Sequence, residues 1–227
     1  MSFFNASKKK EDVQQGGSNH ITGSGFFPIT ILAPVVSVSK GGSESVDLYV
    51  EHQGQKQIVF GNLRVTNNDK TPNKIGAKIF NQLLIIAGLD TVADPVDAEL
   101  PIGKKGASKP CSVLEDLADL DVVMRVQMEY SKYNGNIQEK KIIKSFFRAD
   151  DNATAEEIVN EETPGAGYVR EGKYENNVTY KDGLDEATIT AWISAKRPDG
   201  TGTESSESSP KEAPSFGTKR FGKPADD

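Results

Sequence analysis

Residues 122–148 read VVMRVQMEYSKYNGNIQEKKIIKSFFR and carry the clearest structural signal in the chain. Apolar side chains alternate with more polar ones from Val122 to Tyr130, which is the period of a β-strand with one buried face. Asn134-Gly135 follows, a pair that favours a tight hairpin turn because both residues tolerate positive φ. The chain then returns through a second basic and apolar segment. We therefore predict an antiparallel hairpin over this stretch.

Two segments nearer the N-terminus have the same strand-like character. Residues 26–39 are rich in β-branched side chains, and Pro28 and Pro34 predict either an edge strand or a strand with bulges. Residues 45–65 contain two strand-like runs on either side of a turn at 52–55. We therefore predict a second hairpin there.

The period changes to that of a helix over residues 71–87. Apolar side chains recur on one helical face at Ile75, Ile79, Leu83 and Ile86. Thr71 is the expected N-cap, Pro72 fits the first helical position, and Gly88 fits the stop. Residues 91–110 show no period and are expected to be irregular.

Local signals predict three shorter elements. Ser112 and Glu115 have the spacing of a capping box and predict a short helical turn. Thr154 and Glu157 have the same spacing at the start of a short acidic helix. Residues 176–180 and 187–195 look like the strands of a last hairpin joined at 181–183, which places Trp192 on a strand.

Three hairpins with one helix between the first and second predict a mainly β fold. We expect an OB-like antiparallel β-barrel with an inserted helix, and a β-sandwich with a decorating helix is the alternative. Residues 1–25 are polar and rich in glycine, and 197–227 mix serine, glycine, proline and charge. The expected organisation is a flexible arm over 1–25, a folded domain over 26–196 and a disordered tail over 197–227.

Composition limits the classes of protein that the chain can represent. Apolar residues make up 36% of the 227 residues, and Cys111 is the only cysteine, so an internal disulfide and a multi-cysteine zinc site are excluded. No apolar run approaches the roughly 20 residues of a membrane helix. The N-terminal lysines follow an apolar pair, which is the wrong order for a signal peptide. We expect a cytoplasmic protein that does not bind a membrane.

Catalytic patterns are nearly absent from the sequence. His20 and His52 lack a nucleophile in a suitable context, and Cys111 is better explained as a packed thiol than as a nucleophile. No phosphate-binding loop is present, so we expect no enzyme activity and no cofactor. One alternative is a Mg²⁺-dependent nuclease or recombination enzyme that uses Asp116, Asp119 and Asp121.

Basic and aromatic residues gather locally although the chain has a formal net charge of -6. The predicted central hairpin carries six basic residues against two acidic ones, whereas residues 151–186 carry ten acidic and three basic ones. Proteins that bind single-stranded nucleic acid combine cations for the phosphates with flat rings for the bases. The residues expected to do this are Tyr49, Arg64, Arg125, Lys132, Tyr133, Lys140, Lys141, Lys144, Phe147, Arg148 and Trp192.

Three segments share the layout of a known family: IVFGNLRVTN at 58–67, NKIGAKIFNQLLIIAGL at 73–89, and the strand pair at 122–147. They resemble the single-stranded DNA-binding proteins of tailed bacteriophages, and the resemblance covers roughly residues 45–150. It implies an OB fold and a role in coating exposed strands during replication and recombination, in the host cytoplasm. It also implies a C-terminal tail that recruits replication or recombination proteins.

The tail departs in part from the pattern of that family. Its charges balance over 187–227, and only Asp226-Asp227 are acidic at the end, so the acidic stretch 151–186 is the better candidate to compete with DNA. Phe216 and Phe221 lie in a short segment suited to docking on a partner protein. A third reading of the chain is a virion or scaffold protein in which the basic hairpin is an assembly surface.

Overall fold

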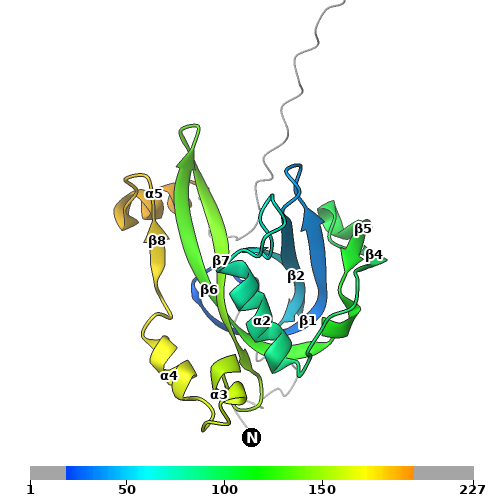
Figure 1. The fold of residues 1–227 in the computed structure, drawn as a ribbon. Helices are drawn as coiled ribbons and strands as arrows, with labels where there is room; N and C mark the ends of the chain where they lie inside the picture. The colour runs from blue at the N-terminus through cyan, green and yellow to red at the C-terminus, as the bar shows by residue number, and fades with distance from the viewer. Residues whose placement is uncertain (1–18, 197–227) are drawn as a thin grey trace, which may run out of the picture.

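The computed structural model describes residues 19–196, which form eight strands and several short helices in one mainly antiparallel β structure (Figure 1). The strands are β1 (Gly25–Val38), β2 (Glu44–His52), β3 (Gln55–Arg64), β4 (Val96–Leu100), β5 (Lys109–Val113), β6 (Leu120–Tyr133), β7 (Asn136–Arg148) and β8 (Val178–Tyr180). The helices are α2 (Gly76–Ile86), η1 (Lys104–Gly106), η2 (Glu115–Leu117), α3 (Ala155–Val159), α4 (Ala166–Gly172) and α5 (Glu186–Lys196).

The long strand β1 connects the two predicted hairpins. Its first half pairs with β6 and its second half pairs with β2, both antiparallel. β2 pairs with β3, β6 pairs with β7, and Cα atoms of β3 approach those of β7 within 8 Å. Five strands thus follow one another in the order β3, β2, β1, β6, β7, and the sheet is open between β3 and β7, which lie near each other. We call these five strands the ring. Among the strands of residues 19–196, only β8, which runs alongside β6, is parallel to its neighbour.

The two prolines of β1 lie in different surroundings. Pro28 pairs with Val123 of β6, and the pairing with β2 begins only at Thr30, so Pro28 has one neighbouring strand, as predicted for an edge position. Pro34 lies in the half that pairs with β2, and the register against β2 shifts between Ile31 and Ala33, so the predicted bulge is also confirmed. Each proline still contributes its carbonyl oxygen. Leu114 N–H donates to Pro34 O at 3.1 Å, and Nδ1 of His52 lies 2.7 Å from Pro28 O.

The main core lies inside the ring of five strands and is closed by α2. Ile31, Leu48, Met124 and Phe146 are at most 1% exposed and come from four different strands. The helix adds Ile79, Leu83 and Ile86 of the face predicted from its period, whereas Ile75, which was expected on that face, is 74% exposed. The burial of these apolar side chains is the main favourable contribution to the free energy of folding, at roughly 25 cal/mol per Å² of apolar surface removed from water.

The helix α2 starts later than expected. It begins at Gly76 rather than near Thr71, and the Gly76 N–H donates to Asn73 Oδ1 at 3.0 Å. A Cβ at position 76 would lie 1.8 Å from the carbonyl oxygen of Arg64, so only glycine allows the helix to approach β3 this closely. Gly88 ends the helix at φ 70°, as predicted.

Three local predictions are confirmed and one is partly wrong. The hairpin turns occur at Gln53-Gly54 and Asn134-Gly135. α3 has the full capping box between Thr154 and Glu157. A helical turn does follow Ser112, but Leu114 precedes it without a side-chain cap, and Ser112 itself lies in β5.

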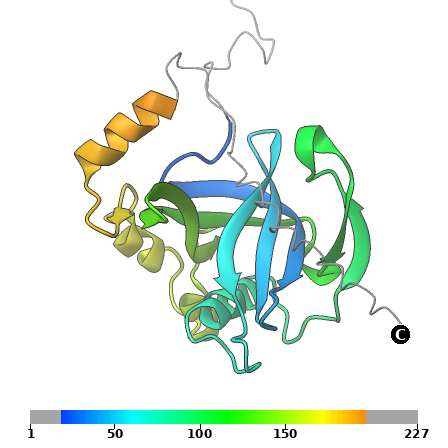
Figure 2. The same ribbon diagram turned by 90° about the horizontal axis from the view of Figure 1, so that it is seen from above.

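Two segments differ in type from the prediction. Residues 91–110, expected to be irregular, contain β4 and the start of β5, which pair as a hairpin. Residues 187–195, expected to be a strand, lie in the helix α5 instead. Asp185 accepts the Thr188 N–H at 2.8 Å, and Ile189 and Ile193 then fall one helical turn apart. Figure 2 shows α5 and the β4–β5 hairpin on opposite sides of the ring of strands.

The predicted arm and tail lie mostly outside the described residues. The exception is 19–25, where Ile21 is fully buried and its N–H donates to Gln57 Oε1 at 3.0 Å. This part of the predicted arm therefore packs on the fold. Between residues 19 and 196, no helix is both long and apolar enough to cross a membrane.

Candidate nucleic-acid interface

The outer half of the β6–β7 hairpin carries most of the predicted interface residues that are accessible. Tyr133, just before the turn, has 64% of its surface exposed. The turn itself is tight, with Asn134 at φ 49° and Gly135 at φ 79°. Asp182 fixes its position from outside, since the Lys132 N–H donates to Asp182 Oδ2 at 2.8 Å. The ring of Tyr133 is therefore presented on a well-defined turn.

The lysines of this hairpin divide over its two faces. Lys141 is opposite Met128 and Lys140 is opposite Glu129, and neighbouring residues in a strand point to opposite sides. Lys144 is exposed at the position where the register between β6 and β7 shifts. The sequence-based expectation of one basic surface is therefore too simple. Lys132 and Lys141 share one face, and Lys140 lies on the other.

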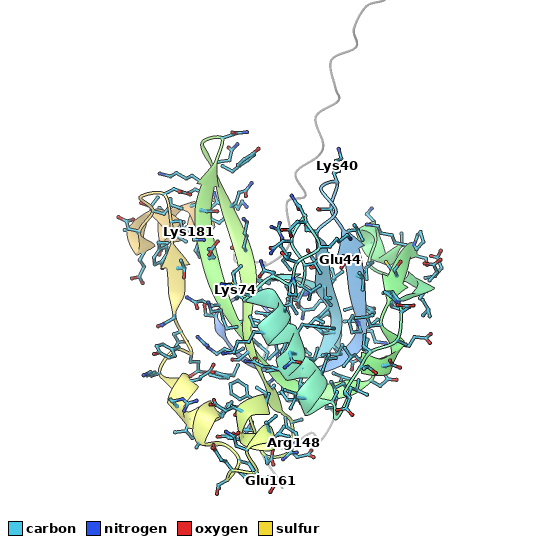
Figure 3. All side chains as sticks on the ribbon, in the orientation of Figure 1. Lys40, Glu44, Lys74, Arg148, Glu161 and Lys181 are labelled. Carbon is cyan, nitrogen blue, oxygen red and sulfur yellow. The ribbon has the colours of Figure 1, made fainter. Side chains whose placement is uncertain are left out.

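Further exposed cations lie on the β1–β2 loop and on the segment that precedes α2. Lys40 is at the tip of the β1–β2 loop, at the same end of the molecule as the β6–β7 turn (Figure 3). Arg64 ends β3 and Lys74 precedes α2, and both are exposed. The sequence analysis missed Lys40 and Lys74, because no aromatic residue or strand pattern marks them. That Lys40 lies at the same end of the molecule as the hairpin turn depends on the fold.

Lys70 belongs to the same end of the molecule but is already paired. Its Nζ lies 2.8 Å from Glu44 Oε1, and this hydrogen bond, together with that from Thr66, lowers the pKa of Glu44. Exposed pairs of this kind contribute little to stability. The pair reduces the free positive charge next to the β1–β2 loop.

The basic residues near the base of the hairpin are held by carboxylates. Arg125 is only 8% exposed, and its Nη1 donates to Glu171 Oε2 at 2.8 Å. Arg148 forms a two-pronged pair with Asp151, with distances of 3.0 Å and 2.6 Å, and this pair lowers the pKa of Asp151. Figure 3 shows Arg148 at the end of the molecule opposite Lys40. Arg148 therefore does not lie with the exposed cations near the β6–β7 turn.

Three of the aromatic residues predicted to contact bases have structural roles instead. Tyr49 was expected to point outward, but it is 7% exposed and packs in a small core under the β4–β5 hairpin. Phe147 is fully buried, with its ring centroid 5.2 Å from that of Tyr168. Trp192 lies on α5, edge-on to Tyr130 and beneath the Lys196 ammonium, whose Nζ is 4.0 Å from the ring centroid.

The aspartates considered as magnesium ligands are engaged separately. Asp116 Oδ2 accepts the Ala93 N–H at 2.7 Å, and Asp121 Oδ1 accepts the Thr30 hydroxyl at 2.6 Å. Asp119 occupies a left-handed turn position at φ 55°. Within residues 19–196, no three His, Cys, Asp or Glu side chains are arranged so as to hold a metal ion.

One further carboxylate is unusual. Asp47 lies on the outer face of β2 next to Tyr49, and burial raises its pKa to about 6. A charged group buried in this way destabilises the fold at neutral pH. Asp47 thus lies on this face of β2 at a cost in stability, and the alternation of the strand in the sequence did not reveal this cost.

Comparison of the chain with models of known protein families gives no match, and comparison with curated protein sequences gives none either.

Proposed function

We propose that the protein is a non-enzymatic, sequence-tolerant single-stranded DNA-binding protein. The observation that carries the proposal is the combination of an exposed ring, Tyr133, with the exposed lysines Lys132, Lys140 and Lys144 on the same β6–β7 hairpin. Rings stack on bases of any sequence, and cations neutralise phosphates. Such a protein would protect exposed strands during replication or recombination of the phage type, in the host cytoplasm.

The proposal includes an OB-like barrel formed by β1, β2, β3, β7 and β6. The strand order supports this, because an OB fold is a five-stranded antiparallel barrel in which the first strand pairs with the second and the fourth. The placement of α2, between the third and fourth of these strands along the chain, also agrees with an inserted helix. Ligands of OB folds commonly contact the loops between the first two and the last two strands. Here these are the β1–β2 loop and the β6–β7 turn.

The proposed contact set differs from the one expected from sequence. It keeps Arg64, Lys132, Tyr133, Lys140, Lys141 and Lys144, and it adds Lys40 and Lys74. It leaves out Tyr49, Phe147, Arg148 and Trp192, which are buried or engaged elsewhere, and Arg125 is treated separately below. Docking of replication or recombination proteins on residues 197–227 remains part of the proposal.

The test is a binding titration of fluorescently labelled oligo-dT against salt. Three to five neutralised phosphates predict a log–log slope of roughly -2 to -3.5. The triple variant K132Q/K140Q/K144Q should reduce the magnitude of the slope by about 2. The control K105Q/K109Q changes two exposed lysines near the β4–β5 hairpin and should leave it unchanged. Absence of binding, or equal slopes for all three proteins, would contradict the proposal, and Mg²⁺-dependent cleavage would favour a nuclease.

A further inference from the structure

A cavity of about 450 Å³ lies between β6 and α4, outside the ring of five strands. Its wall contains three cations, Arg125, Arg170 and Lys173, and one carboxylate, Glu171. Tyr174 forms another part of the wall and is 40% exposed. The cavity is therefore open and lined mainly by positive charge, although it lies in the most acidic part of the sequence.

Arg125 is the residue that indicates a ligand. The Nη1 of Arg125 donates a hydrogen bond to Glu171, whereas its Nε is buried and has no hydrogen-bond partner among the described residues. A buried donor without a partner costs free energy, so such groups usually mark a missing acceptor. Nε and Nη2 form one edge of the planar guanidinium, and that edge matches two oxygens of a phosphate group.

The surrounding groups are placed to complete the site. Lys173 Nζ lies 4.8 Å from the centroid of the Tyr174 ring, and the Arg125 guanidinium carbon lies 5.4 Å from it, so the ring holds two cations beside the cavity. Arg170 is mostly exposed, and among the described residues its carboxylate contact is Glu156, 4.0 Å away. Arg170 and Lys173 are thus available to an anion that reaches Arg125.

We propose that this cavity binds a phosphate group of a nucleotide or of a nucleic-acid strand. The inference rests on the proposed function for its strand form, but a free nucleotide would satisfy the same chemistry. In the strand form, β6 would carry contacts at both ends, with bases stacking near Tyr133 and a phosphate seated beside Arg125. Glu171 opposes the ligand, because it competes for the same guanidinium.

The test uses the full chain labelled with ¹⁵N and three probes: thymidine 5′-monophosphate, thymidine and oligo-dT. Thymidine monophosphate should shift the amide signals of residues 170–177, and thymidine, which lacks the phosphate, should not. The variant R170A/K173A changes exposed side chains and should keep the fold, and it should weaken binding of the monophosphate about three- to tenfold. K105A/K109A removes the same charge far from the cavity and should not.

The two sources of phosphate give different results. A free-nucleotide site loses monophosphate binding in R170A/K173A and keeps oligo-dT binding, whereas a strand site loses affinity for oligo-dT as well. If R170A/K173A binds both probes as the parent does, the cavity inference is overturned. That result would leave the hairpin proposal intact, because K132Q/K140Q/K144Q tests the hairpin separately.

Discussion

The two halves of the β6–β7 hairpin look alike in sequence and differ in structure. Both halves carry basic and aromatic residues, but those near the base are enclosed and those near the turn are exposed. Arg125 and Phe147 lie beneath residues of α4, which contributes Glu171 and Tyr168. Tyr133 and Lys140, at the outer end, project into solvent. The difference arises from what the chain after residue 148 places against each half.

The acidic segment explains this difference. The carboxylates of Asp151 and Glu171 hold arginines of the hairpin. Glu157, on α3, accepts the Gly167 N–H and so holds the start of α4, the helix that carries Glu171. The excess of acidic residues in 151–186 is thus in part an internal complement to the hairpin base. The outer half receives fewer such partners, although Lys181 does pair with Glu129 at 2.7 Å. The proposed function assigns the exposed lysines near the turn, Lys132 and Lys140, to contacts with a ligand.

The distinction between the two halves requires that side chains at the hairpin base stabilise the fold. The largest predicted effect therefore concerns Arg125, which lies at the base. Arg125→Ala should lower the free energy of unfolding by about 3 kcal/mol, because it breaks a partly buried ion pair and leaves Glu171 with the Ser145 hydroxyl as its one donor among the described residues. Lys140→Ala, on the same hairpin but exposed, should change it by less than about 0.5 kcal/mol. Urea denaturation of both variants measures the difference, and equal stabilities would remove the distinction between the two halves.

The second prediction concerns the carboxylate that joins α3 to α4. Glu157 is 5% exposed and accepts three backbone N–H groups, those of Thr154, Gly165 and Gly167. Burial alone would raise the pKa of Glu157, but these hydrogen bonds outweigh burial and lower it from 4.5. A carboxylate whose pKa is lowered by folding stabilises the protein above its unfolded pKa, and this contribution is lost as the pH falls below about 4.5.

Glu157→Gln should therefore cost about 2–3 kcal/mol at pH 7 and much less at pH 3. The reason is that the amide keeps only one accepting oxygen for three donors and carries no charge. Unfolding free energies measured between pH 3 and pH 7 check this. Glu156→Gln is the matched control, since that side chain is on the same helix and 73% exposed. If Glu157→Gln lowers the free energy of unfolding equally at pH 3 and pH 7, the negative charge of Glu157 does not contribute to stability.

Sequence reasoning succeeded where the structure depends on neighbours along the chain. The Asn134-Gly135 turn, the buried face of α2 and the capping box at Thr154 all follow from residues within a few positions of one another. The prediction of a strand over 187–195 was wrong because its apolar residues fit both periods, and the cap at Asp185 favours the helix.

The candidate site was harder to predict because burial there depends on distant segments. Arg125 is paired with a residue 46 positions away, and Tyr49 is covered by a hairpin that begins at Val96. Neither partner carries a recognisable motif. Tyr133 could be predicted, because a turn residue in a tight hairpin has little that can cover it.

The smallest predicted effect concerns Tyr133, and it sharpens the comparison most directly. Tyr133→Ala should weaken binding of oligo-dT by about 1–2 kcal/mol, toward the low end for a stacked base because the exposed ring must lose its freedom when it stacks. Tyr133→Phe keeps the ring and should bind nearly as the parent does. Neither change should alter the fluorescence of Trp192, the only tryptophan, because that ring lies on α5 and packs against Tyr130 rather than at the turn.

If the variant with alanine at position 133 binds as tightly as the parent, the exposed half of the hairpin does not contact the bases. The cations there would then act through phosphates alone, which a steep salt dependence without any loss on Tyr133→Ala would show.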